Sequence, residues 1–205
     1  MASVIEQSSQ LDTFRRPPFP VRRWTVAEYR RMAEAGFLGD EDRVELLEGW
    51  IVPKMTHNPP HDATIQVVQR LFLRLLSDEW SVRAQSAINT SDSEPEPDLA
   101  VVAGPDYRYF DHHPQGAELH LIIEVAESSI RRDRRKARTY AAAGIPHYWI
   151  INLNDRQIEV HSAPDAGQRR YREVRILQPG EQVSLLLDGQ TIANFPVEQL
   201  LPPAE

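Results

Sequence analysis

The sequence predicts an α/β fold in which a mixed β-sheet is flanked by helices. Three apolar stretches of strand length, at about 98–103, 118–126 and 147–151, predict buried strands. The apolar residues of 61–78 have helical spacing and predict a helix, and a second helix is predicted over 131–143, closing at Gly144. Because helices alternate with strands along the chain, we expect the helices to pack against the sheet.

The start of the chain predicts an arm followed by a helix. Residues 1–22 are polar and proline-rich, so we expect an extended or disordered arm, with one domain over residues 23–205. Thr25 and Glu28 have the spacing of a capping box, which predicts a helix that begins there and ends near Gly36.

The remaining elements follow in order. Alternation from Arg43 to Val52 predicts one strand, and Pro59-Pro60 is expected to break the chain before the helix at 61–78. Further strands are predicted at about 81–88 and, as two or three strands, over 156–186, before a short C-terminal segment.

Composition narrows the class of protein. A chain of 205 residues with 41% hydrophobic content suits one soluble domain, and no apolar stretch reaches the roughly 20 residues of a membrane span. The absence of cysteine excludes disulfides and thiolate metal sites, and we expect a cytoplasmic protein. The net charge of −7 argues against a protein that coats nucleic acid nonspecifically.

Two acids in strand sequences are the first candidates for a site. Asp98 opens one predicted strand and Glu124 lies inside another. Burying an ionised carboxylate costs roughly several kcal/mol of folding free energy unless a partner or a metal compensates the charge. If the strands are adjacent, the pair suits Mg²⁺ or Mn²⁺; the alternative is two ordinary acids near strand ends.

Other residues support the metal interpretation. Lys136, on the helix that follows, is expected to reach back over the sheet and to stabilise phosphate charge. Glu45 is a third acidic candidate, with Glu48 as the fallback, although an exposed carboxylate paired with arginine remains the alternative. Strand alternation is expected to place His120 on the same face as Glu124.

The helix at 131–143 is rich in arginine. Arg131, Arg132, Arg134 and Arg135 are candidates for binding nucleic acid, and a solvated helix face is the alternative. His57 and His61 are four residues apart, but Pro59-Pro60 prevents a helical metal pair. For His61 a hydrogen bond at the start of the helix is expected, near the carboxylates.

An ordered set of motifs resembles the Uma-two-type restriction endonuclease family of the PD-(D/E)xK nuclease superfamily. The resemblance runs from about Trp24 to at least Val160. The motifs that carry it are Arg43-Val44-Glu45-Leu46-Leu47-Glu48-Gly49, His61, Glu94-Pro95-Glu96-Pro97-Asp98-Leu99-Ala100-Val101-Val102, Ile122-Ile123-Glu124-Val125, Asp133 through Lys136 to Tyr140, and Gly144-Ile145-Pro146-His147-Tyr148-Trp149-Ile150.

The resemblance implies a restriction-endonuclease-like core and hydrolysis of DNA phosphodiester bonds by a water activated by Mg²⁺ or Mn²⁺. It implies that Asp98 and Glu124 are catalytic metal ligands. It also implies that Glu45 and the Val125 carbonyl complete the metal shell.

The sequence departs from the family pattern at one position. The family's lysine is expected at position 126, where this chain has Ala126. Lys136 is the expected catalytic replacement, with Tyr140 as an accessory residue one turn further along.

Two other functions stay open. A nuclease-fold protein that binds nucleic acid or protein without cutting is favoured by the acidic balance and by Ala126. A hydrolase with Glu124 as general acid lacks a partner motif. Cleavage of both strands would be easiest in a homodimer.

Overall fold

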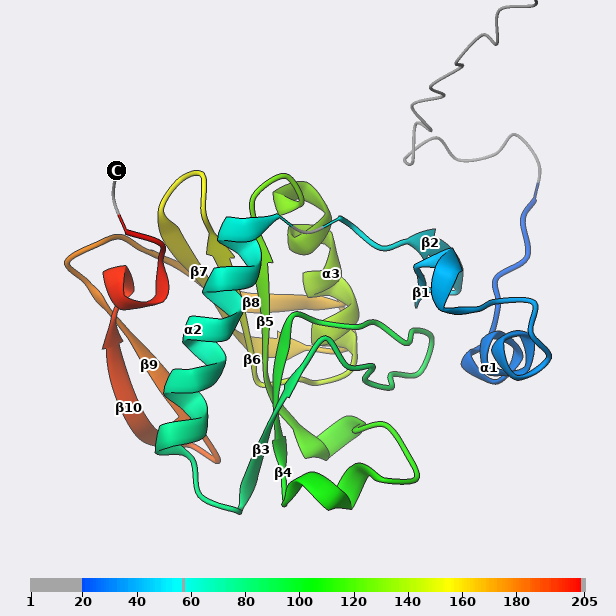
Figure 1. The fold of residues 1–205 in the computed structure, drawn as a ribbon, viewed down its shortest axis with the longest axis horizontal. Helices are drawn as coiled ribbons and strands as arrows, with labels where there is room; N and C mark the ends of the chain where they lie inside the picture. Colours follow the sequence, from blue (N-terminus) through cyan, green and yellow to red (C-terminus); the bar gives the residue numbers. More distant parts are fainter. Residues whose placement is uncertain (1–19, 57, 204–205) are drawn as a thin grey trace, which may run out of the picture.

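The computed structural model describes residues 20–56 and 58–203, and its centre is a six-stranded mixed sheet (Figure 1). The strand order is β3-β4-β5-β6-β7-β8; β5 and β6 are parallel, and the other neighbouring pairs are antiparallel. The strands are β3 (Trp80–Ala84), β4 (Leu99–Ala103), β5 (Leu119–Ala126), β6 (His147–Asn152), β7 (Gln157–Asp165) and β8 (Arg170–Leu177). The expected mixed sheet is confirmed.

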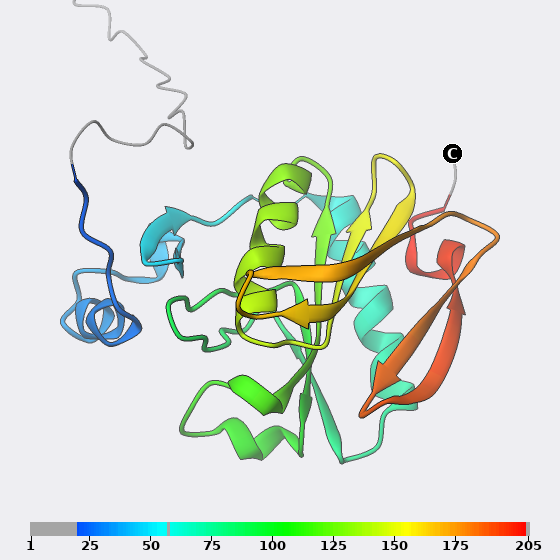
Figure 2. The same ribbon diagram turned by 180° about the vertical axis from the view of Figure 1, so that it is seen from behind.

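Helices cover both faces of this sheet, as the opposite views of Figures 1 and 2 show. Helix α3 (Ile130–Ala142) is the crossover between the parallel strands β5 and β6. Helix α2 (Pro59–Leu75) packs on the other face, together with the hairpin of β9 (Gln182–Leu187) and β10 (Gln190–Pro196).

Alternation along β5 divides the core into two layers. Leu121, Ile123 and Val125 pack on the α2 side, whereas Ile122 and Ala126 pack on the α3 side. Glu124 has the same parity as Ile122 and Ala126 and therefore projects toward α3. The face that holds the acid is thus fixed by the apolar residues on either side of it.

A smaller N-terminal unit, residues 20–56, lies beside the sheet (Figure 1). It contains α1 (Val26–Glu34) and the hairpin of β1 (Val44–Leu47) and β2 (Trp50–Pro53). The capping box predicted at Thr25 and Glu28 is present. Helix α1 has no buried residue, so this unit contributes little apolar surface to the core.

Two local expectations are wrong. The single strand predicted from Arg43 to Val52 is the β1–β2 hairpin, because Glu48 and Gly49 both have positive φ (49° and 77°) and reverse the chain. Pro59 and Pro60 do not break the chain; they occupy the first turn of α2 behind the cap Asn58, where a missing N–H costs nothing.

Two strand details also differ. The strand predicted at 81–88 ends at Ala84, because Gln85 adopts a left-handed φ of 46°. A register shift between Val101 and Val102 leaves His120 as an extra residue in β5. The His120 ring packs edge-on against the Trp80 ring, with 4.6 Å between the ring centroids. Trp80 packs against the core layer on the α2 side, so His120 does not share the face of Glu124.

The C-terminal region has β7, β8 and β9 where two or three strands are predicted, and β10 with a short 3₁₀ turn follows. Most of the predicted arm, residues 1–19, and His57 lie outside the described residues. Over residues 20–56 and 58–203, no helix has both the length and the apolar content needed to cross a membrane.

Candidate active site

Asp98 and Glu124 meet at one end of the β4–β5 pair. Leu99 pairs with Ile123 in antiparallel register, so Asp98, one residue earlier, lies opposite Glu124. Both residues are buried, with 6% and 4% of their surface exposed.

A cavity of about 890 Å³ opens over these two acids. Its walls come from the ends of β4 and β5, the segment between β3 and β4, the first turns of α2 and α3, and the N-terminal unit. The cations and polar groups among its lining residues include Arg43, Lys54, Asn58, His61, Gln85, Arg132 and Lys136.

Asp98 is held through one of its oxygens. Its Oδ2 accepts a hydrogen bond from the backbone N–H of Val125 at 2.8 Å and lies 3.1 Å from His61 Nε2. His61 stands in the first turn of α2, where its backbone N–H donates to the Asn58 side chain. Burial lowers the pKa of His61, but hydrogen bonds and charges of Asp98 and Asp62 raise it above its ordinary value.

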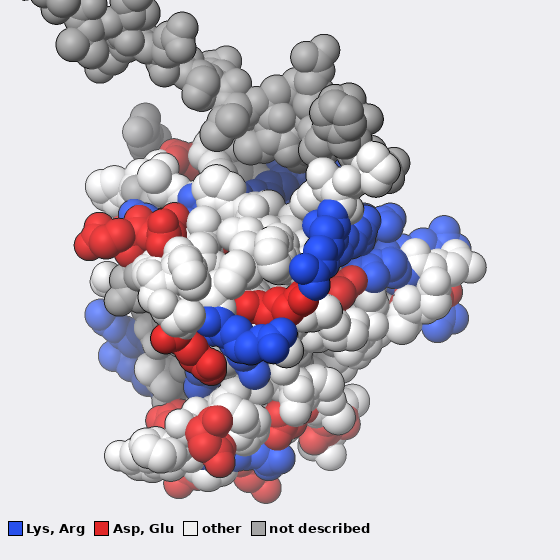
Figure 3. Space-filling view, turned by 90° about the vertical axis from the view of Figure 1, so that its right-hand side faces the viewer, with Lys and Arg blue, Asp and Glu red and all other residues white. Residues whose placement is uncertain are grey.

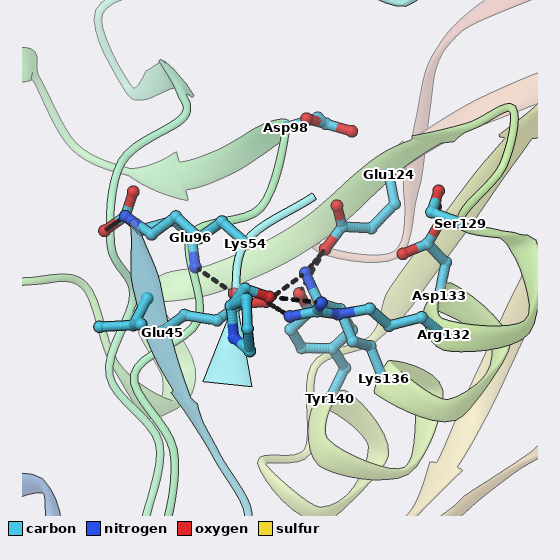
Figure 4. A network of polar contacts seen from close by, with 12 residues as sticks. Glu45, Lys54, Glu96, Asp98, Glu124, Ser129, Arg132, Asp133, Lys136 and Tyr140 are labelled. Carbon is cyan, nitrogen blue, oxygen red and sulfur yellow. Dashed lines mark hydrogen bonds and ion pairs between the residues drawn. The ribbon is translucent and has the colours of Figure 1, made fainter. Parts of the chain in front are cut away.

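Glu124 is also held through one oxygen. Its Oε1 accepts from Lys136 Nζ at 3.0 Å and from the Tyr140 hydroxyl at 2.7 Å (Figure 4). Burial raises the pKa of Glu124; the Lys136 charge opposes this rise, and the charge of Asp98 reinforces it.

Glu45 reaches the same place from β1 of the N-terminal unit. Its Oε1 accepts from Arg132 at 2.6 Å and lies 3.3 Å from Lys136 Nζ. Its Oε2 accepts the backbone N–H of Glu96 at 3.2 Å. Glu45 is 2% exposed, so the expected alternative of an exposed acid is wrong, although its pairing with an arginine is present.

Each of the two strand acids has one oxygen without a hydrogen-bond donor. Among the described residues, Asp98 Oδ1 and Glu124 Oε2 accept no hydrogen bond, and both residues line the cavity. Two anchored carboxylates with one open oxygen each are hard donors of the kind that Mg²⁺ and Mn²⁺ prefer. Val125 lines the same cavity, so its carbonyl remains a candidate third donor.

A larger ligand cluster is absent from this site. Within the part of the chain that the structure describes, no three His, Cys, Asp or Glu side chains gather in a way that could hold a metal ion. Magnesium commonly takes only one or two carboxylates and fills its shell with waters and substrate phosphate, so the pair still suits it.

Lys136 is the buried cation among these acids. Burial lowers the pKa of Lys136, but the carboxylates of Glu124, Glu45 and Asp133 raise it above its ordinary value. Asp133 lies one helical turn before Lys136, and burial is the main cause that raises the pKa of Asp133 to about 6. Lys136 therefore stays charged while buried.

The arginines of α3 do not form one basic face. Arg132 points to the hairpin, where it also donates to the Pro53 carbonyl, and Arg134 makes a two-pronged contact with Glu159 on β7. Arg131 and Arg135 are exposed. On the side that Figure 3 shows, Lys and Arg lie in separate groups with Asp and Glu between them.

Most of the candidate residues therefore lie around one cavity. The structure brings together Asp98, Glu124, Glu45, Val125, Lys136, Tyr140 and His61. It does not bring in His120, and Glu48 pairs with Arg169 at 3.4 Å instead. Their catalytic and metal-binding roles stay predictions.

Two polar groups were not predicted as site residues, although Asp133 stands in one of the motifs that carry the family resemblance. Asp133 stands three residues before Lys136, a spacing that places both on one helix face and that could have indicated it. The backbone N–H of Glu96 fixes Glu45, and no residue type in the sequence signals such a contact.

Comparisons with known proteins agree with this fold. A crystal structure described as a putative nuclease belonging to DUF820 from Anabaena variabilis ATCC 29413 superposes with a TM-score of 0.69 at 14% identity, covering 88% of this chain and 97% of that one. This likeness shows the fold. No curated protein matches the sequence.

The family model named Uma2 and described as "Putative restriction endonuclease" matches residues 26–197. This match spans most of the chain and every candidate site residue, so the protein belongs to the Uma2 family.

Proposed function

We propose that this protein is a DNA endonuclease that hydrolyses phosphodiester bonds with the help of Mg²⁺ or Mn²⁺. One observation carries the proposal: Asp98 and Glu124, opposite each other on adjacent strands, line one cavity beside the buried Lys136, and each has one oxygen that accepts no hydrogen bond from the described residues. Family membership supports the same chemistry.

The protein's own groups would divide the work. The cation bound by Asp98, Glu124 and the Val125 carbonyl would neutralise phosphate charge and lower the pKa of a water. His61 and the Val125 N–H hold the Asp98 carboxylate in place. Lys136, fixed as a cation in a buried site, would stabilise the charge that develops on the phosphate.

Nicking of supercoiled plasmid in Mg²⁺ or Mn²⁺ tests the proposal. Asp98→Asn keeps the shape of the side chain but removes the charge of a ligand, so we expect cleavage to fall by more than about a hundredfold. Asp106→Asn, at an exposed position outside the cavity, is the matched control and should cleave like the wild type.

Two results would contradict this function. The first is wild-type protein that cuts no DNA with either cation. The second is an Asp98→Asn variant that cuts as fast as the wild type, which would place the activity elsewhere or in a contaminant.

A second candidate is a nuclease-fold module that binds without cutting. It is favoured by Ala126 at the position of the family's lysine, and by Lys136 and Arg132, which already neutralise Glu45 and Glu124 within the chain. Calorimetric titration with Mn²⁺ separates the two. The nuclease binds Mn²⁺ and loses it on Asp98→Asn, whereas a module of this kind has no need of the ion.

A further inference from the structure

We propose that Glu45 is a positioning residue, which holds Lys136 beside Glu124, and is not a ligand of the cation. The consequence for catalysis rests on the proposed function, but the contact itself does not. The proposal follows from how the oxygens of the three buried acids are used.

Glu45 has no oxygen left for a metal. Its Oε1 faces Arg132 at 2.6 Å and Lys136 at 3.3 Å, and its Oε2 accepts the Glu96 N–H. Figure 4 shows both cations directed at this carboxylate. Asp98 and Glu124 differ, because each keeps one oxygen without a hydrogen bond from the described residues.

Charge leads to the same assignment. A divalent cation at Glu45 would have to approach two positive side chains, Arg132 and Lys136, or displace them. The absence of any three-residue ligand cluster in the described chain also fits a site of two acids. Glu45 is better placed to neutralise cations of the protein than to bind one from solution.

Lys136 is held from two sides as a result. Its Nζ lies 3.0 Å from Glu124 and 3.3 Å from Glu45, so the two acids fix the ammonium between β5 and β1. Glu45 belongs to the N-terminal unit, whose hairpin Arg132 also holds through the Pro53 carbonyl. Docking of the hairpin on α3 therefore completes the placement of Lys136.

Glu45→Gln is the decisive variant, because it keeps the size of the side chain and removes its charge. In calorimetric titrations we expect its Kd for Mn²⁺ to stay within about twofold of the wild-type value. Asp98→Asn and Glu124→Gln should weaken the binding by more than about tenfold, as loss of a ligand requires.

A second measurement reports on how firmly the Lys136 ammonium group is held. In ¹⁵N-resolved NMR spectra, the buried Lys136 NH₃⁺ group should exchange slowly with water in the wild type and rapidly in Glu45→Gln. With DNA as substrate, kcat should fall by more than about tenfold while KM stays within about twofold, because the substrate contacts are unchanged. Glu45→Asp, which keeps the charge, should restore part of both.

Glu48→Gln is the matched control. Glu48 lies in the turn of the same hairpin, pairs with Arg169 and does not line the cavity. Removing the charge of Glu48 should leave the Mn²⁺ affinity, kcat and the exchange rate of the Lys136 NH₃⁺ group unchanged. If Glu45→Gln fails to fold, Glu45→Asp replaces it: full Mn²⁺ affinity supports the proposal, and a loss equal to that of Asp98→Asn overturns it.

The outcomes are separable. If Glu45→Gln weakens Mn²⁺ binding as much as Asp98→Asn does, Glu45 is a ligand of the cation and the inference is overturned. An unchanged Lys136 signal and an unchanged kcat overturn it as well. If the wild type neither binds Mn²⁺ nor cuts DNA, the proposed function fails, while the Lys136 signal still decides whether Glu45 positions the lysine.

Discussion

At the scale of single residues, Lys136 controls the charge balance of the cavity. It forms ion pairs with Glu124 and Glu45 and is 7% exposed. Breaking a buried ion pair from one side leaves a charge that neither water nor protein compensates, which costs about 3–5 kcal/mol in other proteins. The same lysine is thus needed for stability and, in the proposed mechanism, for catalysis.

Lys136→Met should therefore destabilise the protein by about 3 kcal/mol and abolish cleavage, because Glu124 and Glu45 lose their shared cation. Urea unfolding followed by circular dichroism measures the first effect. Addition of Mn²⁺ should recover part of the lost stability, since a ligand that binds only the folded state stabilises it.

The double variant Lys136→Met/Glu124→Gln is the control for this prediction. It removes both charges of the pair, so its stability should lie closer to the wild type than that of Lys136→Met. If Lys136→Met is as stable as the wild type, the acids around it are not ionised in the folded protein, and the charge argument fails.

Residue patterns predicted part of this cavity. Lys136 was expected to reach back over the sheet and the family resemblance added Tyr140 one turn further along; both contact Glu124. The partners of Glu45 could not be predicted, because Arg132 and the Glu96 N–H meet it only through the packing of the hairpin on α3.

At the scale of elements, α3 is fixed to the sheet by a charged contact as well as by its apolar face. Arg134 donates to both oxygens of Glu159, which is 3% exposed on β7. Burial by itself raises the pKa of Glu159, but the neighbouring His161 and Arg134 lower it to about 2.

This pairing predicts a stability that depends on pH. Because the folded protein lowers the pKa of Glu159 from 4.5 to about 2, the ionised form stabilises the fold above about pH 4.5 and ceases to do so as the pH falls toward 2. Glu159→Gln should cost on the order of 2 kcal/mol at pH 7, allowing for the half-exposed Arg134. Urea unfolding at pH 7, 5, 4 and 3 should show that cost shrinking.

Glu173→Gln is the control, because Glu173 is exposed on the neighbouring strand β8. This substitution should lower the free energy of unfolding by less than about 0.5 kcal/mol at every pH. A Glu159→Gln deficit that stays constant from pH 7 to pH 3 would contradict the assignment to the carboxylate charge.

Element boundaries show what the sequence could and could not predict. The apolar run of β5 and the stripe of α2 depend on burial of one face, which periodicity records. The β1–β2 turn was missed because alternation continues through Glu48-Gly49, and the extra residue His120 depends on register with β4, which no local pattern shows. Predictions failed where the chain turns or shifts register.

At the scale of the whole molecule, the N-terminal unit and the sheet are joined mainly by polar contacts. The ion pairs Arg30–Glu94, Lys54–Glu96 and Arg132–Glu45 cross this junction. Leu46 is fully buried there, whereas α1 has no buried residue. The unit that supplies Glu45 to the cavity thus depends on electrostatics more than the sheet does.

Hydrogen exchange should therefore respond to salt in one part of the molecule. Raising NaCl from about 0.1 M to about 1 M shortens the screening length from about 10 Å to about 3 Å, which weakens the partly exposed ion pairs of the junction. Amides of α1 and of the β1–β2 hairpin should exchange faster in high salt. Amides of β5 and β6, buried between two apolar layers, should not change and serve as the internal control.

The same experiment links docking to the cavity. Arg132→Gln removes the contacts to Glu45 and Pro53, so its hairpin should already exchange at low salt as the wild-type hairpin does at high salt. Equal protection of the hairpin in both proteins at both salt concentrations would contradict an electrostatic junction. It would mean that Leu46 and the backbone bridge from Glu94 to Leu46 hold the hairpin by themselves.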